Sequence, residues 1–321
     1  MGCDAHLVVT GGDDPDALLR RAGKRLAGLE AALSRFLPAS ELSRLNAAAG
    51  TGPVRVSART FDVVAAAVDA WAQTGGRYDP TILPALLRAG YDRTFAELAP
   101  DTAPASVARP SPGCAAIGLE RTVPTVTLPE GTALDLGGIA KGYAADLLVE
   151  ELRSAGAGGA CVNLGGDVRV GGQSPDRAGW TVAIADPYDQ ASDLAHLALA
   201  DGAVATSSRL RRCWATPAGA HHLIDPRTGE PAVTTIAAVT VLASTATRAE
   251  AWTKAVFAAG ARHRLARGDG PDSIAGLAVL ASADLSGLCV DERRTIYHTD
   301  DMREYLTWTR NSGGISVELV G

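Results

Sequence analysis

Residues 134–146 read LDLGGIAKGYAAD, and the interpretation of the whole chain starts from this stretch. The stretch runs from Leu134 and Asp135 into two glycines and then into a helical pattern that has Lys141 in its first turn. Glycines at a corner permit close approach to the backbone, and free N–H groups at a helix start favour an anion such as phosphate. The spacing fits neither GxxxxGK[ST] nor GxGxxG. By itself the stretch indicates either a corner where a helix packs or a ligand site.

The composition limits the classes of protein. With 321 residues, 46% apolar, 21% charged and a net charge of −6, the chain is globular, and we expect no nucleic-acid partner. No run of about 18 apolar residues could span a bilayer, so we expect no membrane partner either. The five cysteines form no C-x-x-C pair, which predicts free thiols in a reducing compartment. The N-terminus lacks a signal-peptide pattern, so we expect a cytoplasmic protein.

The apolar periodicity predicts an α+β fold. Steps of three and four residues predict helices over 16–36, 61–71, 139–155 and 247–260. Short apolar runs broken by Gly, Pro and Asp predict strands at 1–10, 123–128, 160–164, 179–185, 203–207, 221–224 and 236–243. Because the strands come in runs, we expect a mainly antiparallel sheet flanked by helices. We expect one domain over 1–321, in which the Pro-, Ala- and Ser-rich loop 102–113 separates two lobes.

Several further segments have both a structural and a functional interpretation. HHLIDPRTGEP (221–231) is typical of a strand that enters a turn, and His222 is also a candidate general base. VNLGGD (162–167) is typical of a strand end, GGRYDPT (75–81) of a loop, and Ser40 of a helix cap. Glu250 and Lys254, four residues apart in RAEAWTKAVF (248–257), fit an ordinary surface ion pair.

The order of these segments resembles the FAD:protein FMN transferase family, the ApbE-like flavin transferases. The resemblance begins at Met1-Gly2, covers about 1–260 and is loose over the last sixty residues. It runs through SELSRLN (40–46), TGGRYDPT (74–81), AGYDR (89–93), LDLGGIAKGYAAD, VNLGGD, ATSS (205–208), HHLIDPRTGEP and the helix at 248–260. The resemblance implies that the chain has the ApbE-like fold, splits FAD as a substrate, transfers FMN to a Ser or Thr hydroxyl of an acceptor flavoprotein, and releases AMP.

The resemblance also implies roles for particular residues. His222 would deprotonate the acceptor hydroxyl, and the glycine corner would lie near the phosphates. The residues expected along FAD are Met1, Arg77, Tyr78, Asp79, Asp135, Lys141 and Ile224.

A magnesium site is implied as well, but one of its positions is altered. The family's site draws on the corner at Gly138 and on an Asp and a Thr at i, i+4 of a helix, which match Glu250 and Lys254 here, with Thr253 beside the latter. Glutamate can bind Mg²⁺ through oxygen, whereas an ammonium repels it. Either Gly138, Glu250 and Thr253 hold Mg²⁺ without the second ligand, or Lys254 replaces it. We expect Lys254 to supply part of the missing positive charge to the FAD pyrophosphate, steered by Glu250.

Two other functions compete with protein flavinylation. The chain could hydrolyse the FAD pyrophosphate or transfer flavin to a small molecule, because water or another hydroxyl can take the place of the protein acceptor. Alternatively, it could bind FAD without turnover, in keeping with the altered metal position. His222 and Asp135 favour an enzyme, since a binding protein has less use for a base beside the phosphates.

Overall fold

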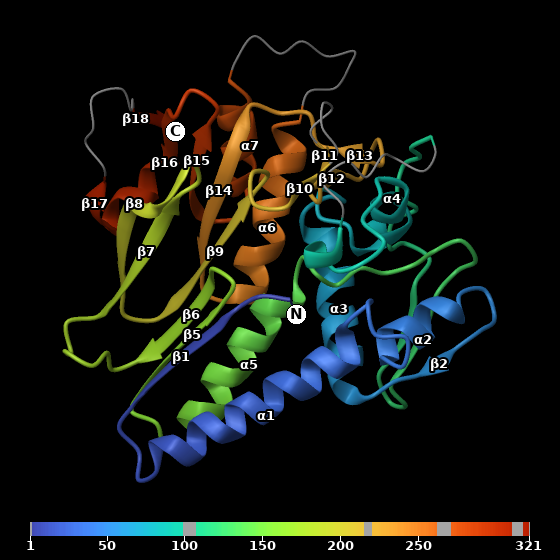
Figure 1. Ribbon diagram of the computed structural model, residues 1–321, viewed down its shortest axis with the longest axis horizontal. Coiled ribbons are helices and arrows are strands. Elements are labelled where there is room, and N and C mark those ends of the chain that lie inside the picture. Colours follow the sequence, from blue (N-terminus) through green and yellow to red (C-terminus); the bar gives the residue numbers. More distant parts are fainter. Residues whose placement is uncertain (1, 99–106, 215–219, 262–270, 310–316, 321) are drawn as a thin grey trace. The chain divides into compact units, whose positions relative to one another are not determined.

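The computed structural model describes residues 2–98, 107–214, 220–261, 271–309 and 317–320 (Figure 1). The chain forms two compact units. Unit 1 consists of residues 1–2, 24–140 and 212–231, and unit 2 consists of residues 3–23, 141–211 and 232–321.

The division does not fall at the loop 102–113, where we expected two lobes to separate. Residues 24–140 lie in one unit on both sides of that loop, and the described part of the loop, 107–113, contains neither helix nor strand. Its backbone is tied into unit 1, because the N–H of Ser111 donates to the carbonyl of Pro226 at 2.8 Å. Each unit is assembled from segments distant in sequence, which composition alone does not reveal. That the whole chain is one domain stays a prediction.

Unit 2 is built on an eight-stranded sheet. All neighbouring strands pair antiparallel except the last two, which are parallel, so the expectation of a mainly antiparallel sheet is confirmed. In spatial order the strands are β1 (Ala5–Thr10), β5 (Gly159–Leu164), β6 (Asp167–Gly172), β9 (Gly202–Ser208), β14 (Ile236–Ala243), β15 (Ser286–Asp291), β16 (Ile296–Thr299) and β18 (Val317–Val320).

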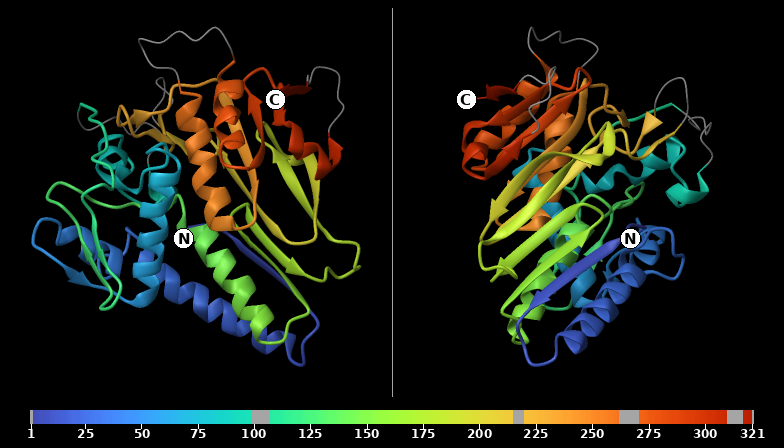
Figure 2. Two further views of the ribbon diagram at one scale, coloured as in Figure 1. Left: turned by 180° about the vertical axis from the view of Figure 1, so that it is seen from behind. Right: turned by 60° about the vertical axis from the view of Figure 1, so that its left-hand side comes forward.

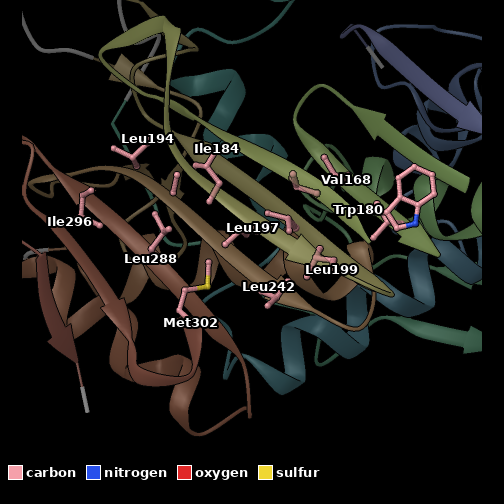
Figure 3. Close-up of a cluster of buried hydrophobic side chains, with 14 of the residues drawn as sticks. Val168, Trp180, Ile184, Leu194, Leu197, Leu199, Leu242, Leu288, Ile296 and Met302 are labelled. Carbon is pink, nitrogen blue, oxygen red and sulfur yellow. The ribbon is translucent and has the colours of Figure 1, made fainter. Parts of the chain in front are cut away.

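A second sheet of unit 2 packs on this one through an apolar cluster. It has three strands in the order β17 (Leu306–Thr309), β8 (Asp189–Leu199) and β7 (Trp180–Asp186). Along β7 buried and more exposed residues alternate, so Trp180, Val182 and Ile184 point to the cluster. Figure 3 shows these strands meeting Val168, Leu242 and other residues of the large sheet.

Helices cover the opposite face of the large sheet (Figures 1 and 2). Helix α6 (Ala246–Ala259) lies on β9 and β14, and α7 (Asp272–Ala281) lies on β15 and beside α6. Every residue of β14 is therefore buried, in agreement with its unbroken apolar sequence IAAVTVLA. Ten of the fourteen residues of α6 are buried as well.

Helix α5 (Ala140–Ser154) is held against the start of α6 by its own small and acidic residues. A Cβ atom on Gly142 would lie 2.3 Å from the carbonyl oxygen of Ala246, so only glycine permits this approach. One turn later, the carboxylate of Asp146 accepts hydrogen bonds from the N–H groups of Ala246 and Thr247, both at 2.8 Å. The GGIAKGYAAD pattern thus fixes how two helices of unit 2 meet.

Unit 1 contains the remaining helices and three short strand groups. Helix α1 (Pro15–Leu33) starts in unit 2 and ends in unit 1, followed by α2 (Glu41–Ala47), α3 (Ala58–Gln73) and α4 (Leu83–Arg88). The strands are β2 (Val54–Arg55), β4 (Thr125–Thr127) and β3 (Gly118–Glu120) in one sheet, and the pairs β10 (Cys213–Trp214) with β11 (Ala220–His221) and β12 (Ile224–Asp225) with β13 (Glu230–Pro231). Short 3-10 helices occur at Pro80–Ile82 and Phe95–Glu97, and in unit 2 at Asp300–Glu304.

All four predicted helices are present, with ends displaced by no more than a few residues. The predicted cap is confirmed too, because the Ser40 side chain accepts from the N–H of Ser43 at 2.9 Å. The elements that were not predicted include strands β2, β3, β6, β8, β10, β13 and β15–β18 and helices α4 and α7.

Candidate active site

The stretch 134–140 is anchored in unit 1 by its backbone. The side-chain amide of Asn46 donates to the carbonyl of Leu134 at 2.9 Å and accepts from its N–H at 2.8 Å. The N–H of Asp135 donates to the carbonyl of Pro80 at 2.8 Å. Three of the segments that carry the resemblance, SELSRLN, TGGRYDPT and LDLGG, therefore come together in one place.

Asp135 is held by two groups of the protein. Its Oδ1 accepts from the N–H of Gly137 at 2.7 Å, and its Oδ2 lies 2.6 Å from Nε of Arg35. A Cβ on Gly137 would lie 2.8 Å from the same Oδ1, so a larger residue here would have to move the carboxylate. The corner is thus packed around Asp135 itself, whether or not a ligand also contacts it.

Arg35 is a residue that the sequence analysis did not single out. Its side chain is 7% exposed, its guanidinium donates to the carbonyl of Tyr91 at 2.9 Å, and it lies over the rings of Phe36 and Tyr91. Such a planar, always charged group suits a buried contact with both a carboxylate and aromatic faces. The signals that could have found Arg35 are its place just before the SELSRLN motif and the AGYDR motif that contains its partner Tyr91.

The segment 77–81 combines exposed and buried residues. Arg77 is exposed and donates to the carbonyl of Thr74 at 3.1 Å, whereas Tyr78 and Asp79 are buried. The Asp79 carboxylate accepts from the N–H and the hydroxyl of Thr81, at 2.8 and 2.6 Å. Burial raises the pKa of Asp79 even though these hydrogen bonds act against the rise. Asp79 therefore has a structural role as the cap of the 3-10 helix at 80–82.

His222 lies in unit 1, two residues before the IDPRTG turn. It is half-buried, and its Nδ1 lies 3.4 Å from the carbonyl oxygen of Arg212. Two residues on, Ile224 is buried against Trp214 and Ala85. Nη2 of Arg227 lies 2.8 Å from Oδ2 of Asp225, and this ion pair within the turn confirms the expected structured turn. The first residue, Met1, lies outside the described residues.

Unit 2 contains a cluster of four ionisable side chains from three elements, which we call the charge quartet: Lys141, Asp167, Glu250 and Lys254. Nζ of Lys141, on α5, lies 2.8 Å from Oδ2 of Asp167 on β6 and also pairs with Oε1 of Glu250. Nζ of Lys254, one turn along α6, lies 3.5 Å from the same Oε1. Glu250 is fully buried, so the expected surface pair of Glu250 and Lys254 is wrong. The cause is that ten of the fourteen residues of α6, Glu250 among them, are buried.

Mutual attraction sets the charges of this quartet. Burial would lower the pKa of Lys141, but Asp167 and Glu250 outweigh it and raise that pKa above its ordinary value. Burial would raise the pKa of Glu250, but the two ammonium groups lower it. Burial lowers the pKa of Lys254, and the attraction of Glu250 offsets this only in part. Lys141 and Glu250 thus form a charged pair at neutral pH.

The residues expected at a magnesium site do not fit Mg²⁺. Both oxygens of Glu250 already accept hydrogen bonds, Oε1 from two ammonium groups and Oε2 from the N–H of Gly142 at 2.8 Å. The Thr253 hydroxyl donates to the Glu250 carbonyl at 2.7 Å and bonds Ser207. Within the described ranges, no group of three or more His, Cys, Asp or Glu side chains could hold a metal ion. The expected Mg²⁺ set of Gly138, Glu250 and Thr253 therefore has no support.

The profile of the ApbE family matches residues 1–274. The chain belongs to the ApbE family. The FAD:protein FMN transferase of Vibrio cholerae is 32% identical over 216 residues, which make up 65% of this chain and 64% of that relative. The FAD:protein FMN transferase of Klebsiella pneumoniae is 30% identical over 251 residues, 76% of each chain.

Solved structures agree on the fold. The ApbE protein of Thermotoga maritima superposes with a TM-score of 0.81 at 24% identity, covering 95% of this chain and 96% of that one. The flavin transferase ApbE of Vibrio cholerae gives a TM-score of 0.75 at 24% identity, over 95% and 96% of the two chains. The family and the ApbE-like fold expected from the sequence are thereby confirmed.

In this ApbE-family chain the predicted site residues form two sets. Asp135 lies beside the 77–81 segment in unit 1, and Lys141 joins Glu250 and Lys254 in unit 2. The sequence analysis missed Arg35 and Asp167 as partners of Asp135 and Lys141. Asp167 ends the VNLGGD motif, which was the signal that could have found it. No helix among the described residues is long and apolar enough to cross a membrane.

Proposed function

We propose that this chain transfers FMN from FAD to the hydroxyl of a Ser or Thr side chain in an acceptor flavoprotein, with release of AMP. The observation that carries the proposal is membership of the ApbE family, together with relatives that bear the name FAD:protein FMN transferase. The ordered set of motifs, from SELSRLN to HHLIDPRTGEP, supports it.

The reaction is a displacement at phosphorus. The acceptor oxygen forms a bond to the phosphorus of the FMN half, the bond from that phosphorus to the bridging oxygen breaks, and AMP leaves with the bridging oxygen. Such transfers depend chiefly on positioning and on neutralisation of charge. In this proposal the half-buried His222 takes the proton from the hydroxyl. Lys141, kept charged by Asp167 and Glu250, neutralises part of the negative charge of the FAD phosphates.

The remaining predicted contacts belong to the same proposal. Asp135 and the exposed Arg77 contact FAD, whereas the buried Tyr78, Asp79 and Ile224 shape the wall behind it. Asp135 retains capacity for this because each carboxylate oxygen accepts more than one hydrogen bond. Its contacts with Arg35 and Gly137 fix its direction beforehand.

One experiment distinguishes the proposed transferase from a hydrolase and from a binding protein without turnover. The purified chain is incubated with FAD and an acceptor domain of the kind that this family modifies, and AMP and the acceptor mass are measured. AMP with a mass gain of one FMN less one water on the acceptor supports the transferase. AMP with free FMN and an unmodified acceptor supports the hydrolase. Bound FAD without AMP supports the binding protein.

Two histidine variants test the proposed base. His222→Gln is expected to lose nearly all AMP release while it still binds FAD, because the proton acceptor is gone. His6→Gln serves as the matched control, since His6 is exposed on β1. Equal activity of His222→Gln and the unaltered chain would exclude His222 as the base.

We also propose a reducing compartment for this protein. Cys114, Cys161 and Cys289 are free thiols, and all three are buried or half-buried. Fractionation of cells that produce the chain, followed by detection with an antibody, tests a cytoplasmic location.

A further inference from the structure

The charge quartet uses two of the only three lysines in the sequence. The chain has 30 Lys and Arg residues together, of which only Lys24, Lys141 and Lys254 are lysines. Lysine differs from arginine in carrying a compact point charge with three donors. A chain that uses arginine almost everywhere else thus brings two ammonium groups to one carboxylate, Glu250.

The two lysine side chains of the quartet are more exposed than its two carboxylates. The side chains of Lys141 and Lys254 are 17% and 20% exposed, whereas those of Asp167 and Glu250 are 3% and 0% exposed. The more accessible side of the quartet is therefore formed by its lysines. Lysine amines are hydrogen-bond donors without an acceptor, so this side suits an anion better than a cation, although the formal charges of the four groups cancel.

Each carboxylate oxygen of the quartet already has a partner within the protein. Oε1 of Glu250 faces both ammonium groups, and Oε2 accepts from Gly142. Oδ2 of Asp167 faces Lys141, and its Oδ1 accepts from the N–H of Thr206 at 3.3 Å. Because Mg²⁺ requires near-octahedral oxygen ligands, it would have to displace at least one ammonium group.

We propose that Lys254 is a built-in cation that takes the place of a divalent metal ion, so that the quartet binds the pyrophosphate group of a dinucleotide directly. Asp167 and Glu250 act as positioning residues, because their ion pairs with Lys141 and Lys254 hold the two amines in place. The identity of the pyrophosphate compound as FAD rests on the proposed function, whereas the preference of the quartet for an anion over Mg²⁺ does not.

Binding experiments without turnover test the proposal. Inorganic pyrophosphate is titrated into the full chain in EDTA, and its affinity and the rise in Tm are measured. We expect saturable binding and a higher Tm in EDTA. Mg²⁺ alone is titrated in the same way, and we expect no saturable heat and no change in Tm. Saturable Mg²⁺ binding, or pyrophosphate binding that requires Mg²⁺, would overturn the proposal.

Substitutions at Lys254 sharpen the test. Lys254→Met keeps the length of the side chain without its charge and is expected to weaken pyrophosphate binding at least about tenfold in EDTA. Lys254→Thr restores an oxygen at this position, and here Mg²⁺ is expected to raise both Tm and pyrophosphate affinity. Lys24→Thr, at an exposed position of α1, is the matched control and should leave all values unchanged.

A charge-preserving variant separates folding from binding. If Lys254→Met does not fold, Lys254→Arg keeps the positive charge and is expected to bind pyrophosphate in EDTA. Failure of folded Lys254→Arg to bind, or unchanged affinity in folded Lys254→Met, contradicts the role of the charge. Absence of AMP release with intact pyrophosphate binding would overturn the proposed function but leave this inference standing.

Discussion

Nε of Arg35 lies 2.6 Å from Oδ2 of Asp135, and these two residues are one hundred positions apart in the chain. The guanidinium also lies 4.1 Å from the ring centre of Phe36 and 4.6 Å from that of Tyr91. One side chain thus joins the region after α1, the AGYDR segment and the glycine corner. We infer that Arg35 sets the direction of the Asp135 carboxylate before any ligand binds.

Replacement of Arg35 is expected to destabilise the protein strongly. Arg35→Ala leaves the Asp135 carboxylate, which is 12% exposed, without its cation, and breaking such a pair costs about 3 kcal/mol or more. Arg35→Lys keeps the charge but loses the planar contact with two rings, so we expect an intermediate loss. The free energy of unfolding is measured by urea titration.

Arg121→Ala is the matched control for Arg35→Ala. Arg121 also pairs with an aspartate and lies over a phenylalanine ring, but its side chain is 73% exposed. Exposed pairs of this kind contribute less than about 1 kcal/mol. Similar losses for the two variants would show that Arg35 has no special role beside Asp135.

Gly142 supplies a second prediction about stability. Its Cβ position is blocked by the backbone of Ala246, and its N–H donates to Oε2 of Glu250. Gly142→Ala should push α5 away from α6 and lower the stability by about 1–3 kcal/mol, as overpacking does. Gly23→Ala, in the interior of α1, meets no atom within 4 Å and should raise the stability by about 0.4–1 kcal/mol. Thermal unfolding of both variants gives the comparison, and a stabilised Gly142→Ala would contradict the close approach.

The sequence predicts local structure better than it predicts the partners of the site residues. The helix at 139–155 and the cap at Ser40 are local features, set by periodicity and by one side chain next to its own backbone. The ion pairs of Lys141 with Asp167 and with Glu250 join residues 26 and 109 positions apart, and no local pattern specifies such contacts.

At Glu250 the local rule for Glu–Lys pairs predicts the ion pair but not its burial. Glu and Lys at i, i+4 usually face solvent, but the intervening residues of α6 are Ala251, Trp252 and Thr253, all buried. After Lys254 the helix continues as the apolar run AVFAA, which indicates burial on more than one face and was available in the sequence. The partner that neutralises Glu250 was not, because it comes from α5.

The cysteines give a prediction about chemical reactivity. Burial raises the pKa of Cys161 to about 11 and raises those of Cys114 and Cys289 as well, and the thiolate fraction falls roughly tenfold for each unit. Cys213 is exposed. A thiol reagent at pH 7.5 should therefore modify Cys213 fast and these three slowly, as peptide mass spectrometry can measure. All five should react in denaturant, and rapid modification of Cys289 in the folded state would contradict its burial.

Asp79 gives a prediction about the pH dependence of stability. Burial raises its pKa in the folded state above the ordinary value of about 3.9. Between these two pKa values the folded state binds more protons than the unfolded state, so the free energy of unfolding falls as pH rises. Asp79→Asn removes this fall while its side-chain oxygen still accepts from Thr81. The Tm of Asp79→Asn minus that of the unaltered chain should therefore increase from about pH 4 toward neutral pH.

Asp176 is the control for Asp79, because its pKa is shifted in the opposite direction. Its carboxylate accepts from the Ser174 hydroxyl at 2.8 Å, and this hydrogen bond lowers its pKa. A lowered pKa contributes stability at neutral pH that is lost as pH falls, so the Tm difference for Asp176→Asn should decrease as pH rises. Calorimetry of both variants across the acid range measures the two slopes. A flat or falling difference for Asp79→Asn would mean that its carboxylate is stabilised in the charged form, because hydrogen bonds from Thr81 then outweigh the cost of burial.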